Sequence, residues 1–153
     1  MLGVAAWLLW SALGVATSRR VAHPAPPRIC GLFLLAAVLV PLDVAFIRAS
    51  RIVFQGVPGA YLALAEQAAV VAIALFFPAW LLGLVFQWAA RLYVGQGRTL
   101  AAAYAVECVG SLGGGLASTL LSRLGVGNLA GVFLASAATA AAAWAGLRAA
   151  GAR

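Results

Sequence analysis

The chain has 153 residues, of which 65% are hydrophobic and only 8% are charged, and its mean hydropathy is +1.07. Ordinary soluble domains carry about 25% charged residues, and a water-soluble domain of this length could not bury so much apolar surface. The composition therefore excludes a typical soluble enzyme and predicts an all-α, polytopic transmembrane helix bundle.

The net charge of +7 arises from ten arginines and no lysine. The arginines lie at the ends of apolar runs, not on a basic face interleaved with aromatic residues, which argues against nucleic-acid binding. Cys30 and Cys108 form neither a CxxC pair nor a Cys/His spacing, and His23 is the single histidine. We therefore expect no metal and no cofactor in this chain.

Apolar runs predict about five spans, at residues 1–18, 29–48, 61–94, 99–122 and 129–147. The first run is followed by Arg19 and Arg20, whereas a signal peptide carries positive charge before its apolar core, so a retained span is favoured over a signal peptide. The proline-rich segment "RRVAHPAPPR", residues 19–28, predicts a non-helical loop. A second turn-rich break is predicted at residues 53–61.

The third run is longer than a bilayer requires. At ~1.5 Å per residue it would measure ~50 Å as one helix, against a hydrocarbon core of ~30 Å. Either it is one helix kinked at Pro78, or it is two short helices that meet there. We favour the single kinked helix, because a chain-turning segment follows at residues 95–98 and no comparable loop surrounds Pro78.

The arginines also predict an orientation. One set of span ends holds seven of them and the other holds three, and the richer side is expected in the cytoplasm. The N-terminus would then lie outside and the C-terminus in the cytoplasm. Aromatic residues near span ends are compatible with interfacial belts: Trp7, Trp10, Tyr61, Trp88, Tyr93 and Trp144.

The stretch "AYAVECVGSLGGGLAS", residues 102–117, carries the most unusual pattern. On a helix that turns ~100° per residue, Glu107, Ser111, Gly114 and Ser118 fall in one narrow stripe. Gly110, Gly115 and Tyr104 flank this stripe, and the opposite side holds Val109, Leu112, Leu116 and Leu120.

Small residues let membrane helices approach closely, so we expect the small side to face protein and the leucine side to face lipid. The predicted helix-contact seam consists of Gly110, Gly114, Gly115 and Ser118. A phosphate-binding glycine loop is disfavoured, because such a loop needs a strand before it.

Glu107 has two interpretations. With Tyr104 and Ser111 it could form an intramembrane site for a proton or cation, since carboxylates inside a bilayer are costly and usually face the protein interior. Alternatively it is a structural residue that joins helices by hydrogen bonding. Arg91, near the inner end of the third span, is expected to extend to the head groups.

Two segments carry a resemblance to a known family. "FFPAWLLGLVFQWAARLY", followed by "GRTLAAAYAVECVGSLGGGLASTLLSRLGVGNLAGVF", resembles the membrane domain of bacterial spermidine synthase-like membrane proteins over about residues 75–135. The matching positions are Pro78, Ala90 to Leu92, Gly97, Arg98, Tyr104, Ala105, Glu107, Gly110, Ser111, Gly114, Gly115, Leu124 and Gly125.

The resemblance implies the bacterial cytoplasmic (inner) membrane and a fold like part of a six-helix half of the major facilitator transporters. Relative to the family, the chain looks like spans two to six. The family's first span and its cytoplasmic aminopropyltransferase domain have no counterpart here.

Three functions follow as hypotheses. The favoured one is a non-catalytic membrane module that anchors or scaffolds a partner, either in a homo-oligomer or with another membrane or cytoplasmic subunit. The second is a permease-like subunit that moves a small solute past Glu107. The third is a polyamine aminopropyltransferase, which we disfavour because the family's catalytic aspartates and glycine-rich cofactor loop have no counterpart here.

Overall fold

The computed structural model describes residues 2–20, 25–53 and 63–151. Over these ranges the chain forms five α-helices and no strand, so the prediction of an all-α fold is confirmed. The helices are α1 (Leu2–Ser18), α2 (Pro26–Val53), α3 (Leu64–Gly95), α4 (Leu100–Arg123) and α5 (Asn128–Gly151). Residues 21–24 of the first predicted loop, residues 54–61 of the second, His23, Tyr61 and Arg153 lie outside the described residues.

Four of these helices, α2 to α5, are long and apolar enough to cross a bilayer, which makes the chain a multi-pass membrane protein. The exception is α1, which has 17 residues. At ~1.5 Å per residue it is ~25 Å long, several ångströms shorter than a typical hydrocarbon core.

A proline explains why one helix begins earlier than the sequence predicted. Helix α2 begins at Pro26 and continues to Val53, so it is longer than the predicted span at 29–48. The predicted loop therefore ends earlier than expected, because a proline in the first turn of a helix removes no intrahelical hydrogen bond. Helix α3 passes through Pro78 without a break, so this region is one helix and not two.

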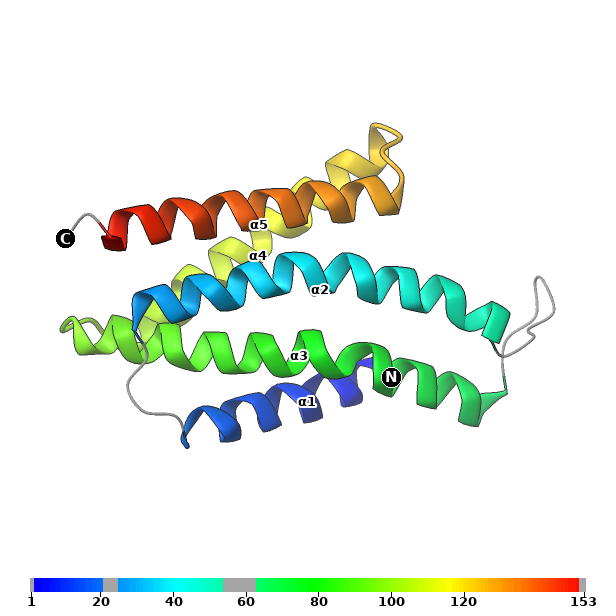
Figure 1. Cartoon of the computed structure of the whole chain (residues 1–153), viewed down its shortest axis with the longest axis horizontal. Coiled ribbons are helices and arrows are strands. Elements are labelled where there is room, and N and C mark those ends of the chain that lie inside the picture. Colours follow the sequence, from blue (N-terminus) through cyan, green and yellow to red (C-terminus); the bar gives the residue numbers. More distant parts are fainter. Residues whose placement is uncertain (1, 21–24, 54–62, 152–153) are drawn as a thin grey trace.

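The helices pack in pairs. Helix α1 lies along α3, α2 lies along α5, and α2 also contacts α3, whereas α4 touches only α3 and α5 among the described helices (Figure 1). The buried core lies between α2 and α3 and consists of Ile29, Leu81, Leu84, Val85 and Trp88. Trp88, one of the aromatic residues compatible with an interfacial belt, is only 6% exposed and belongs to this core.

Two glycines bring α1 and α3 into backbone contact. A Cβ atom on Gly14 would overlap the carbonyl oxygen of Trp80, and one on Gly83 would overlap the carbonyl oxygen of Ser11. Van der Waals contact between backbones is a main source of helix association in lipid, because the hydrophobic effect does not act between helices there. This crossing therefore requires residues without side chains on both helices.

Polar side chains fix α1 along α3 on either side of this crossing. The indole Nε1 of Trp10 donates to the carbonyl of Ala72 at 2.9 Å. Arg91 donates from Nη1 to the carbonyl of Ser18 at 3.4 Å, near the C-terminal end of α1, where a positive charge is favourable. Arg91 thus contacts the end of a neighbouring helix.

We predict that Gly83→Ala destabilises the bundle by about 1–3 kcal/mol, because the new methyl group forces two backbones apart. The free energy of unfolding can be measured by circular dichroism during titration of detergent micelles with dodecyl sulfate. Gly113→Ala is the matched control, since its Cβ would meet nothing within 4 Å. Equal stability of the two variants would contradict the close crossing of α1 and α3.

Candidate functional site

The turn between α3 and α4 sets where α4 begins. Gly97 has a φ of +81°, a conformation that favours glycine. Thr99 is the N-cap of α4, and its hydroxyl accepts from the backbone N–H of Ala102 at 3.2 Å. Arg98 donates to the hydroxyl of Tyr93 at 2.9 Å, and its guanidinium lies 4.9 Å from the centre of that ring. These contacts join the last turn of α3 to the first turn of α4.

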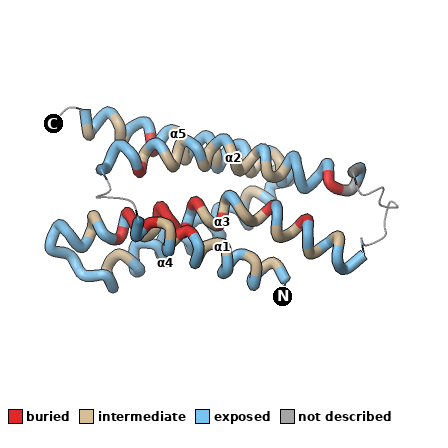
Figure 2. Tube along the Cα trace, turned by 60° about the horizontal axis from the view of Figure 1, so that its bottom comes forward, coloured by how far each residue is buried: buried red, intermediate tan, exposed pale blue. Residues whose placement is uncertain are grey.

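Helix α4 is the least covered helix of the bundle. None of its residues is buried, and it is pale blue over most of its length in Figure 2. The leucine side is the most open, with Val109 70% and Leu112 66% exposed. The small-residue side instead lines two hollows, one toward α3 and one toward α5.

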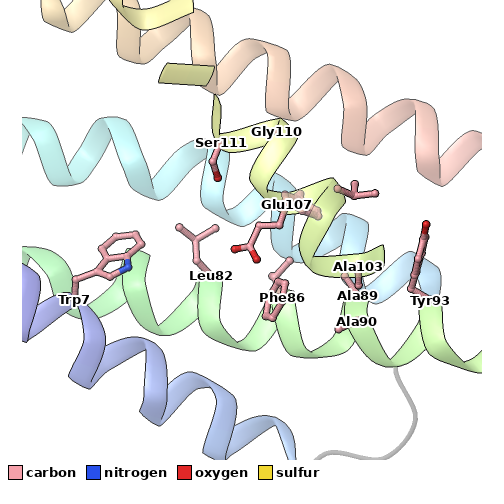
Figure 3. A pocket seen from close by; sticks show the side chains of 13 residues that line it. Trp7, Leu82, Phe86, Ala89, Ala90, Tyr93, Ala103, Glu107, Gly110 and Ser111 are labelled. Carbon is pink, nitrogen blue, oxygen red and sulfur yellow. The ribbon is translucent and has the colours of Figure 1, made fainter. Parts of the chain in front are cut away.

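The first hollow has a volume of about 740 Å³ and contains Glu107. Figure 3 shows the Glu107 carboxylate extending from α4 toward α3, near Leu82 and Phe86. Ser111 lines the same hollow one turn further along α4. Two of the three residues of the predicted polar site therefore share one cavity.

Tyr104, the third predicted member, does not line this hollow. Its ring lies against Phe86, with 5.1 Å between the ring centres and an angle of 49° between the planes. The tyrosine is 49% exposed. In this position it supports the wall of the hollow through Phe86.

Three of the four predicted seam residues line the two hollows, and Gly115 lines neither. Gly110 lines the first, whereas Gly114 and Ser118 line the second, a groove of about 620 Å³ between α4 and α5. A Cβ atom on Gly110, Gly114 or Gly115 would meet nothing within 4 Å. Within the described part of the chain, these glycines leave open space and do not make a close helix contact.

Sequence reasoning missed the crossing that the fold does form, between α1 and α3. A signal for it was present, because Gly14 and Ser18 are four residues apart in α1 and both are buried. Ala79 and Gly83 repeat this spacing in α3. Pairs of small residues four apart are typical of helix contacts in membranes.

The chemistry of the first hollow is limited to one acidic group. Asp43 and Glu66, the other two acidic residues, do not line it. Among residues 2–20, 25–53 and 63–151, no group of three or more His, Cys, Asp or Glu side chains could hold a metal ion. A single carboxylate among apolar walls can pair with a cation or carry a proton.

No protein-family model, no curated protein and no solved structure matches this chain.

Proposed function

We propose that this chain is a non-catalytic membrane module that holds another membrane-embedded chain in the groove between α4 and α5, with a second copy of itself as the partner. The observation that carries the proposal is the composition of this groove. Its lining is mostly small, with Gly114, Ala117 and Ser118 from α4 and Gly131, Ala135 and Ala138 from α5.

Lipid covers the two sides of α4 unequally. Acyl chains cover Leu112 and Leu116 well, because both are apolar. A surface of small residues offers few contact atoms to a flexible lipid tail. A neighbouring helix can bring its backbone close to such a surface and make more van der Waals contacts. With no residue of α4 buried, this helix gains more than any other from a partner.

The resemblance to spermidine synthase-like membrane proteins is compatible with this role. In that family the membrane helices accompany a cytoplasmic enzyme domain, and we propose that this chain is related to the membrane part. Its three acidic residues are spread over α2, α3 and α4. If aminopropyl transfer takes place in this complex, we propose that a partner protein catalyses it.

We predict that Gly114→Leu weakens self-association by about tenfold or more, because the leucine fills the groove where a partner helix would lie. The measurement is resonance energy transfer between labelled copies in liposomes at varied protein-to-lipid ratio. Gly113→Leu is the matched control, because Gly113 has equally open space and does not line the groove. A wild-type chain that stays monomeric at every ratio would contradict the proposal.

We further propose that the chain lies in the bacterial inner membrane with the C-terminus in the cytoplasm. The end of the bundle that carries the α3–α4 turn also holds Arg19, Arg20, Arg28, Arg91 and Arg148, in addition to Arg98. A green fluorescent protein fused after residue 153 is expected to fluoresce in cells, since it folds in the cytoplasm and not after export. A fusion protein that is present at normal abundance but does not fluoresce would show that the C-terminus lies outside, and would contradict the proposed orientation.

A second candidate is a permease-like subunit, and the observation that favours it is the extension of Glu107 into the first hollow. If a solute passes this carboxylate, Glu107→Gln should abolish uptake of labelled polyamines or amino acids into proteoliposomes without loss of helical structure. Glu66→Gln is the control, because Glu66 lies in the first turn of α3. Uptake no greater than that of protein-free liposomes would exclude these solutes as cargo.

A further inference from the structure

The hollow between α3 and α4 contains one acidic side chain, Glu107, in a mostly apolar lining. Of the side-chain hydrogen bonds formed among the described residues, none involves the Glu107 carboxylate. The arginine nearest in sequence, Arg98, is engaged by the ring and hydroxyl of Tyr93. A carboxylate at membrane depth is costly unless it is paired, so this hollow favours a ligand that brings a positive charge.

The walls of the hollow favour a bulky, apolar ligand body. Four aromatic residues on three helices line it: Trp7 from α1, Phe33 from α2, and Phe86 and Tyr93 from α3. Aromatic faces attract organic cations as well as apolar groups. The space between them exists because the facing positions are small, with Ala89 on α3 and Gly110 on α4.

The count of acidic groups limits the charge of the ligand. With Glu107 alone in the lining, a second positive charge on the ligand would have no partner there and would be desolvated at a cost. A divalent metal ion would need several oxygen ligands, and the hollow offers one carboxylate and the hydroxyls of Ser111 and Tyr93. The site therefore suits a monovalent organic cation better than a polyamine or a metal ion.

We propose that the hollow between α3 and α4 binds a monovalent organic cation with a bulky apolar body, whose charge pairs with Glu107 and whose body contacts Trp7, Phe33 and Phe86. A volume of about 740 Å³ lies within the range of known small-molecule sites. The proposal does not rest on self-association through the α4–α5 groove or on transport, because it concerns equilibrium binding in the other hollow.

Tetraphenylphosphonium is a suitable probe, and tetraphenylborate is its counterpart of the same shape and opposite charge. Binding of each to the full chain in zwitterionic lipid nanodiscs can be measured by equilibrium dialysis, with empty nanodiscs subtracted. We expect saturable binding of the cation to one site per chain and no saturable binding of the anion. An excess of spermidine should not displace the cation.

Two variants test the two parts of the site separately. Glu107→Gln removes the charge and should weaken cation binding by at least about tenfold. Gly110→Leu keeps the charge but fills the hollow, and it should weaken cation binding by a similar factor. The Gly113→Leu variant, altered on the same helix, should bind the cation as tightly as the wild type. Nothing lies within 4 Å of a Cβ at either glycine, so at both positions a side chain starts into open space.

Three results would overturn the proposal. They are no saturable binding of tetraphenylphosphonium, unchanged affinity in Glu107→Gln, or equal affinity for tetraphenylborate. The last result would identify the hollow as a purely apolar space filled by lipid tails. None of them would bear on self-association through α4 and α5, which the Gly114→Leu experiment tests.

Discussion

The arrangement of this bundle depends on the place where α1 and α3 touch without side chains between them. Gly14 and Gly83 allow each backbone to meet the other, and Trp10 and Arg91 attach α1 to α3 on either side of this crossing. This contact holds the 17-residue helix α1, the shortest of the five described helices, against α3. Helix α3 then serves as the common support, because its other sides contact α2 and the beginning of α4.

Helix α4 is also rich in small residues, but its glycines make no close helix contact. A Cβ atom on any of them would meet nothing within 4 Å. In water such a helix would be unstable against collapse onto the bundle, but lipid solvates its leucine side as well as protein would. The resulting hollows divide the small-residue side into two regions of different chemistry. The half near the α3–α4 turn has a carboxylate and aromatic walls, and the half near α5 is lined mostly by small residues, with no acidic or aromatic side chain among them.

The fold class could be predicted from the sequence because composition and run length are sufficient to identify membrane helices. The direction of the small-residue side of α4 could be stated from helical periodicity, which brought Glu107 and Ser111 to the same side of the helix. Which helix packs against that side could not be predicted, because periodicity shows which residues share a face and not which helix lies next to it. Tyr104 was expected beside Glu107 for its spacing, but its ring found an aromatic neighbour on α3. The role of Trp88 was missed for a related reason, since position near a span end does not reveal whether a side chain faces lipid or the core.

The central claim is that lipid covers the leucine side of α4 while the small-residue side faces the two hollows toward α3 and α5. The most direct measurement is a nitroxide scan of residues 104–122 in liposomes, with oxygen and a water-soluble nickel chelate as relaxation agents. The account predicts low access for the chelate throughout, and oxygen access that rises every three to four residues with maxima at Val109, Leu112, Leu116 and Leu120. High access for the chelate along the helix, or oxygen maxima at Glu107, Gly114 and Ser118, would contradict it.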